Sequence, residues 1–422
     1  MQKDYKALFL KWGLQISFCW LLLAAGIGVF LRYMQLGFLQ PITVPENFQY
    51  SFWLHTHSHV MFLGWIFNIL YVTLIDAFVD QTRVSRYRKL FIGFQLMVLG
   101  MLISFPVQGY GPVSIAFSAL HMFGSYLFAI WLLTDAKSFK EHISFYWIRW
   151  GLFYMVLSSI GPFLLGIIKA KGLAGTYLYN LAIYFYLHFQ YNGWFIFVCI
   201  GLFFRWIEQN NLPFRRSDAN RFLMLTTLAC IPTFALSALW IQPPIWVYLV
   251  GGAGAIVQLW GMVYFFRSLY PLLTHWQQQG FFSSRVSFLS GVWIIALIAF
   301  IVKLILQLIS VLPSMAMLAY QYRSVVIAYL HLVFIGVVSC FLLGYLSAKK
   351  LLKGVTNWFY RGAWIWISGF ILHELLLILP IFNTKANSFL YPVLFGISFW
   401  MWLGIGLLTL GIFTVRKSSN VI

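Results

Sequence analysis

Residues 53–76 read WLHTHSHVMFLGWIFNILYVTLID, and this stretch places three histidines at the start of a continuous apolar run. A run of roughly 20 apolar residues can cross about 30 Å of hydrocarbon as a helix. Ionisable side chains are costly at that depth and usually mark function. The stretch therefore predicts a membrane-spanning helix that carries a functional group.

Similar apolar runs recur through the whole chain, in which 62% of the residues are hydrophobic and 9% are charged. This composition excludes a water-soluble globular protein. We predict an all-α polytopic membrane protein, a single transmembrane domain over residues 1–422 with twelve helices. The expected spans are 10–31, 53–76, 89–108, 113–134, 147–168, 176–204, 221–241, 244–267, 286–311, 322–347, 359–381 and 390–415.

The net charge of +19 comes from basic residues in the short loops, which argues against nucleic acid as a partner. Most of these residues fall on the side of the amino terminus. The opposite side carries only Arg32, Lys169, Lys171, Arg323 and Lys385. The positive-inside rule then places both termini in the cytoplasm of a multi-pass protein, for which we expect the bacterial inner (cytoplasmic) membrane.

The remaining sequence features add little chemistry. Four cysteines stand singly inside apolar runs, so neither a disulfide framework nor a zinc site is indicated: Cys19, Cys199, Cys230 and Cys340. Residues 268–285 are expected to form the longest cytoplasmic loop, lying along the membrane surface. No internal repeat is evident.

Five histidines from five spans share one depth once the spans are oriented. At about 1.5 Å per residue, each lies roughly 9 to 18 Å below the outer boundary. A common level suggests a shared cofactor plane, and each is a candidate metal ligand: His59, His121, His188, His331 and His373. The alternative for each is a hydrogen bond that joins two helices. His142 and His275 fall in cytoplasmic loops, where a solvated side chain is expected.

The histidine cluster in the second span has one preferred ligand. In a helix His55 and His59 share a face while His57 points nearly the opposite way, so one metal cannot easily take all three. His59 is the deepest and is our candidate axial ligand for a heme, with His331 as its partner from another span. The roles of His55 and His57 stay open. Gly64 would let the ring or a neighbouring helix approach closely.

These motifs resemble the catalytic subunit of the heme-copper oxidases and nitric oxide reductases, in particular short, divergent cytochrome c oxidase subunit I-like proteins. The resemblance implies a twelve-span bundle with a low-spin heme b held between His59 and His331. His188, in LHFQYNGWF, is similar to a copper-ligating histidine of that family. The implied activity is oxygen or nitric oxide reduction, with quinol or cytochrome c as electron donor and partner subunits in the membrane.

Two departures from the family pattern put the oxygen-reducing centre in doubt. Tyr329 stands where the family has the histidine of the high-spin heme, and residues 221–241 hold no histidine pair for copper. We therefore expect an incomplete or altered copper site. A second heme, copper or a non-heme metal at His121, His188 and His373 is the alternative.

Buried and interfacial charges complete the candidates. Glu374 and Lys303 lie inside spans. Each is a candidate either for a proton path or for a structural polar contact. Arg323, Lys385 and Arg32 are placed to meet heme propionates through charge-assisted hydrogen bonds. The buried acids are too few for a proton-pumping route.

Two other functions fit the span count. One is an NnrS-like heme or copper membrane protein of nitric oxide response, whose cofactor persists without turnover. The other is a twelve-helix secondary transporter, but the internal repeats and interrupted helices typical of that class are not evident in the sequence.

Overall fold

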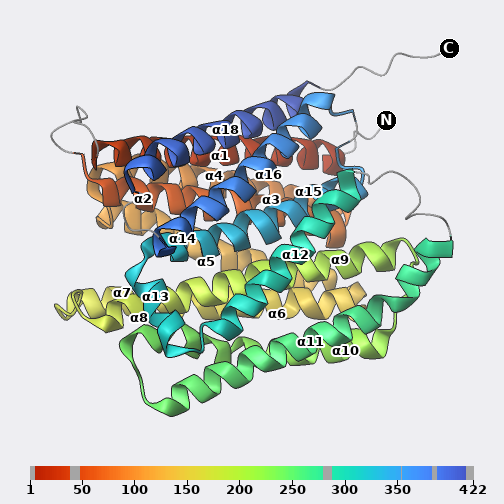
Figure 1. Ribbon diagram of the computed structural model, residues 1–422. Helices are drawn as coiled ribbons and strands as arrows, with labels where there is room; N and C mark the ends of the chain where they lie inside the picture. The colour runs from red at the N-terminus through yellow and green to blue at the C-terminus, as the bar shows by residue number, and fades with distance from the viewer. Residues whose placement is uncertain (1–4, 39–47, 279–287, 353, 383–386, 415–422) are drawn as a thin grey trace. The chain divides into compact units, whose positions relative to one another are not determined.

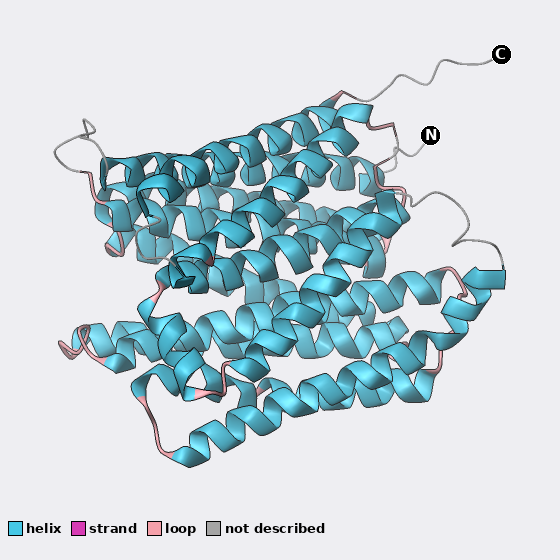
Figure 2. Ribbon diagram, in the orientation of Figure 1, coloured by secondary structure: helices cyan, strands magenta, loops and turns pink. Residues whose placement is uncertain are grey.

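The chain is helical throughout the part that the computed structural model describes, residues 5–38, 48–278, 288–352, 354–382 and 387–414. Figure 2 shows helices joined by short loops and no strand among these residues. Twelve helical stretches within them are long and apolar enough to cross a membrane. Each contains or closely follows the span predicted for it, which confirms the all-α, twelve-span fold class.

The described chain forms two compact units, residues 1–135 with 346–422 (unit 1) and residues 136–345 (unit 2). Both are seen in Figure 1. That the two units together form a single transmembrane domain stays a prediction. The helices of unit 1 are α1 (Tyr5–Gln35), η1 (Leu36–Phe38), α2 (Tyr50–His59), η2 (Val60–Ile66), α3 (Phe67–Phe78), η3 (Gln81–Arg83), α4 (Val84–Gln108), α5 (Pro112–Asp135), α16 (Asn357–Leu377), α17 (Leu379–Phe382) and α18 (Asn387–Phe413).

Unit 2 contains the middle of the chain. Its helices are η4 (Ala136–Phe139), α6 (Ile143–Ser158), α7 (Ile160–Ala170), α8 (Tyr177–His188), η5 (Phe189–Phe195), α9 (Ile196–Gln209), α10 (Arg216–Cys230), η6 (Pro232–Ile241), α11 (Ile245–Gln278), α12 (Phe288–Ile309), α13 (Pro313–Gln321), α14 (Arg323–His331) and η7 (Leu332–Ser339). The next helix, α15 (Cys340–Ala348), begins in unit 2 and ends in unit 1.

Glycines let the helices of unit 1 approach at backbone distance. A Cβ on Gly362 or Gly404 would collide with backbone atoms of α18 or α16 respectively. The first and last helices also lie side by side, since the Trp402 indole donates to the Leu22 carbonyl at 3.1 Å (Figure 1). Small residues at helix contacts replace the hydrophobic driving force that a lipid surrounding cannot supply.

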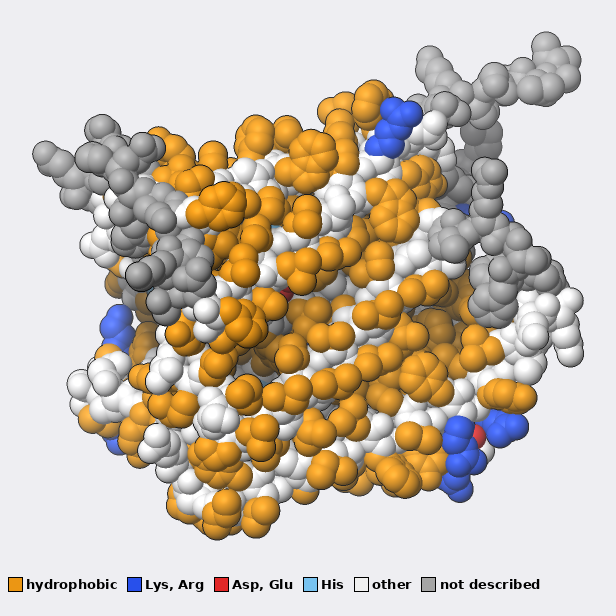
Figure 3. All heavy atoms as spheres, viewed as in Figure 1, with side chains coloured by type: hydrophobic (Ala, Val, Ile, Leu, Met, Phe, Trp, Pro, Cys, Tyr) orange, Lys and Arg blue, Asp and Glu red, His pale blue; other side chains and the backbone are white. Residues whose placement is uncertain are grey.

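Unit 2 packs by the same means. Gly193 of η5 lies against Tyr154 of α6, and Gly254 of α11 lies against Thr233 of η6. On the outside, apolar side chains cover most of the face shown in Figure 3, as lipid contact requires.

One loop prediction is wrong in part. The helix α11 continues to Gln278 instead of ending near residue 267, so residues 268–278 are helical. Pro271 is accommodated inside this helix. The rest of the predicted loop, as far as Arg285, lies outside the described residues.

Candidate functional site

Three of the predicted histidines stand at the same kind of helix irregularity. His59, His188 and His331 each end an α-helix and directly precede a π-helical segment: η2, η5 and η7 respectively. In η2, for example, Phe67 donates its backbone N–H to the carbonyl of Phe62, five residues back. π-Segments are rare and occur frequently at functional sites.

The three π-segments also share a sequence pattern. Each histidine is followed five residues later by a glycine: Gly64, Gly193 and Gly336. Because π-type hydrogen bonds join residues five apart, each glycine lies one such turn beyond its histidine. The pattern occupies the second, sixth and tenth spans. The spacing is present in the sequence, but only the π-segments of the structure single it out as a repeated feature.

His59 is held with one ring nitrogen bound and the other available. Its Nδ1 lies 2.9 Å from the backbone carbonyl oxygen of His55, which can only accept, so Nδ1 carries the proton and Nε2 the lone pair. The ring packs on Phe105, with centroids 4.3 Å apart, and is half-buried. Gly64 lies against Trp20 of α1, so the expected close approach is made by a neighbouring helix.

His55 and His57 lie on different faces, as predicted. The ring of His55 contacts Tyr110, with centroids 4.6 Å apart. His57 turns toward α1, where its Nδ1 donates to the Ala24 carbonyl at 2.8 Å and its ring fits over Gly28. Only His59 and His55 therefore share surroundings.

His121 of α5 is buried between two aromatic rings in unit 1. Its ring centroid lies 4.7 Å from that of Phe67 and 4.6 Å from that of Phe94. Its side chain is buried, and Nε2 has no hydrogen-bond partner in the described structure. The two groups that flank the ring, Phe67 and Phe94, are apolar and cannot ligate a metal.

His373 belongs to a polar network that joins α1, α2 and α16. Arg32 donates to the Gln35 side chain at 2.8 Å, and its Nη2 lies 3.3 Å from His373 Nε2. Since a guanidinium only donates, His373 Nε2 accepts and its Nδ1 proton faces Glu374, 3.7 Å away. Gln35 in turn donates to Tyr50. Arg32, which we predicted to meet a heme propionate, therefore contacts the side chains of Gln35 and His373.

His188 has partners on both ring nitrogens in unit 2. Its Nε2 lies 2.8 Å from the carbonyl oxygen of Cys230, and Asn192 Nδ2 lies 3.1 Å from its Nδ1. The carbonyl is accessible because α10 ends at Cys230, just before Pro232 begins η6. A proline removes a backbone donor and breaks the α-helical ladder there. This geometry favours the helix-joining role over copper ligation.

Tyr329 takes part in the same neighbourhood. Its ring lies near that of Tyr191, which directly precedes Asn192 in η5. The two phenol rings are 6.2 Å apart between centroids. Neither Asn192 nor Tyr191 was singled out from the sequence, although both lie in the quoted motif around His188.

His331 and Arg323 lie at the two ends of α14. Arg323 begins this helix and is exposed, while His331 ends it and is half-buried. Eight residues separate them, which is about 12 Å along a helix. His59 belongs to unit 1 and His331 to unit 2, and their pairing about one heme stays a prediction. Lys385 lies outside the described residues.

Comparisons with known proteins bear on the fold. No protein-family model matches the chain, and no curated protein matches it. Among solved structures it is similar to a heme-copper terminal oxidase dimer determined by cryo-electron microscopy, with a TM-score of 0.62 and 12% sequence identity. The likeness covers 96% of this chain and 82% of that chain. The chain therefore has a twelve-helix membrane fold similar to that of a heme-copper oxidase.

Proposed function

We propose that this chain is a heme-binding membrane redox protein that holds a b-type heme through His59 and His331, with Arg323 near the propionates. The observation that carries the proposal is the orientation of His59. Metal-ligating histidines almost always donate their second ring N–H to a carbonyl or carboxylate, which fixes the tautomer and the ring. The His55 carbonyl does this for His59 and leaves Nε2 as the ligand atom.

The residues around His59 offer aromatic surface to a porphyrin. Phe105 and Tyr110 line the His59 ring with aromatic surface, which is a favourable wall for a flat apolar macrocycle. A heme bound there would supply one-electron transfer. The chain's own part is to fix the ring of His59 and to exclude water with the surrounding apolar side chains.

We do not extend the proposal to copper at His188. Both of its ring nitrogens already have partners, and the span that follows, α10 with η6, has no histidine. A metal that includes His121 and His373 remains a separate prediction. Reduction of oxygen or nitric oxide, a quinol or cytochrome c donor and partner subunits are likewise proposals drawn from the fold.

The test is the heme content of purified full-length protein. Wild type should give a pyridine hemochrome spectrum and stoichiometric iron, and His59→Ala should lose the low-spin ferrous bands. His57→Ala is the matched control, because His57 lies on the same helix but faces α1. His142→Ala is the second control, since its side chain is 42% exposed. Equal spectra in all of these variants would refute the ligand assignment.

An NnrS-like role without turnover is the second candidate. It is favoured by Tyr329, which stands where the resemblance implies the high-spin heme ligand and whose ring lies near that of Tyr191. Under this alternative the heme is present but the reduced protein consumes neither oxygen nor nitric oxide. Electrode measurements with a chemical electron donor separate the two.

A further inference from the structure

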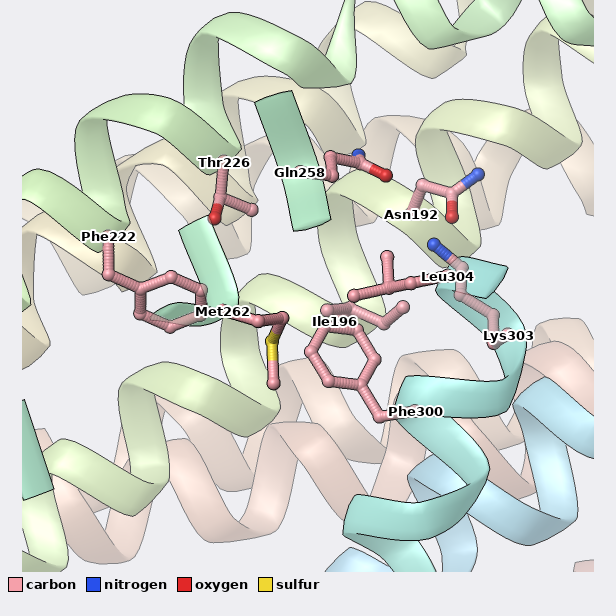
Figure 4. Close-up of a pocket in the computed structure, with 9 residues that line it drawn as sticks. All are labelled: Asn192, Ile196, Phe222, Thr226, Gln258, Met262, Phe300, Lys303 and Leu304. Atoms are coloured by element: carbon pink, nitrogen blue, oxygen red, sulfur yellow. The ribbon is translucent and has the colours of Figure 1, made fainter. Parts of the chain in front are cut away.

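A small cavity in unit 2 contains a buried lysine that neither the fold comparison nor the proposed heme site explains. Four elements and the start of α9 contribute to its wall, as Figure 4 shows. The lining residues are Asn192, Ile196, Phe222, Thr226, Gln258, Met262, Phe300, Lys303 and Leu304. None of these nine side chains is acidic.

Lys303 of α12 is only 1% exposed, and its amino group points toward the carboxamide of Asn192 (Figure 4). The oxygen atoms Asn192 Oδ1 and Gln258 Oε1 are both buried without a hydrogen-bond partner in the described structure. A buried amide oxygen without a donor is costly. The cavity therefore contains the amino group of Lys303, which can donate several hydrogen bonds, together with two amide oxygens that lack a donor.

The orientation of Asn192 follows from its neighbours. The Cys230 carbonyl only accepts, so His188 Nε2 carries the proton and Nδ1 is the acceptor. The Asn192 group that faces Nδ1 must then be its NH₂. This leaves Oδ1 as the atom presented to the cavity, and an amide flip would break the bond to His188.

An ammonium group has three donors and no acceptor. Asn192 Oδ1 and Gln258 Oε1 provide two acceptors, and the cavity has room for about one water, which Thr226 can also bind. We propose that this cavity is a binding site for a primary amino group and one water, and that Lys303 occupies it.

The experiment is chemical rescue of Lys303→Ala in the full-length protein in detergent. This variant vacates the position of the amino group and leaves both oxygens in place. Methylammonium chloride should raise its Tm by about 1 °C over equal sodium chloride, since a chain of this length unfolds with a large entropy change. Tetramethylammonium has no N–H donor and should not rescue.

Gln307→Ala is the matched control. Gln307 lies four residues further along α12, is buried and does not line the cavity. Its Tm should respond equally to methylammonium and sodium. Absence of selective rescue in Lys303→Ala overturns the proposal, as does a Tm of Lys303→Met equal to or above that of wild type.

If Lys303→Ala does not fold, a double-mutant cycle with Lys303→Met and Asn192→Leu decides the question. The loss of Tm from Asn192→Leu should be smaller in the Lys303→Met background than in wild type, whereas additive losses contradict the proposal. These measurements use stability alone. Heme content is read separately, so failure here leaves the heme proposal untouched, and failure of the heme proposal leaves this one standing.

Discussion

The imidazole of His188 connects Asn192 of η5 to the backbone carbonyl of Cys230. The carbonyl oxygen lies 2.8 Å from the Nε2 atom of His188. Tyr154 reaches the same helix through the carbonyl of Thr227, at 2.7 Å. Both contacts bind α10 close to the break at Pro232. Side chains of two neighbouring helices thus hold the end of α10, and the two histidines of the heme proposal are not needed for it.

His188→Ala should therefore cost stability and leave heme content unchanged. Removal of the ring leaves the buried Asn192 amide without its Nδ1 acceptor, while the Cys230 carbonyl keeps the Thr233 hydroxyl as a donor. An unsatisfied buried group costs about 1–3 kcal/mol. Thermal unfolding in detergent and pyridine hemochrome analysis of the same sample check both parts. Loss of bound metal at an unchanged Tm would instead make His188 a ligand.

Gly193→Ala should destabilise unit 2, whereas Gly166→Ala should not. A Cβ on Gly193 collides with the Tyr154 side chain and forces α6 away from η5, and overpacking of this kind costs about 1–3 kcal/mol. Gly166 of α7 has no atom within 4 Å of the added carbon. There the substitution gains helix propensity of about 0.5–1 kcal/mol. The two Tm values measured side by side test the contact, and equal shifts would contradict it.

Arg32→Met and His373→Ala should show strongly non-additive effects on stability. Either change alone breaks the contact between Arg32 Nη2 and His373 Nε2. Once one of the two side chains has been replaced, replacing the other cannot break that contact again, so the cost of the double variant should fall short of the sum by about 0.5–3 kcal/mol, as for residues in one network. Additive Tm losses would show that the two side chains act independently, as a metal role for His373 would require.

Much of the fold could be predicted because it depends on local composition. Each span is an apolar run bounded by polar residues, and the helix Tyr50–Phe78 found over the predicted span 53–76 shows how little tertiary context this needs. The end of α11 was missed because its last turns, through Gln278, mix apolar with polar residues and include Pro271. There the helix continues past a proline, a residue that usually ends one.

The candidate site could be predicted only in its residue types. A π-segment is not visible in hydrophobic periodicity, and the histidine-to-glycine spacing that marks it also occurs at His275 and Gly280, where the surrounding sequence is rich in glutamine. The partner of His188 is the backbone carbonyl of Cys230 at the end of α10, 42 positions along the chain, and no side-chain pattern predicts it. Depth alone could not separate His188, both of whose ring nitrogens have partners, from His59, which has its Nε2 left for a ligand.

The positive-inside rule predicts the orientation of the chain in the membrane, and this prediction can be tested directly. Ala174 lies in the short exposed loop between α7 and α8, and Lys137 lies in η4 on the side that the positive-inside rule assigns to the cytoplasm. In a background without the four native cysteines, Ala174→Cys should react with a membrane-impermeant maleimide added to intact cells. Lys137→Cys should react only after the cells are permeabilised. The reverse labelling would place both termini outside, and the predicted common level of the five histidines would then lie in the cytoplasmic half of the membrane.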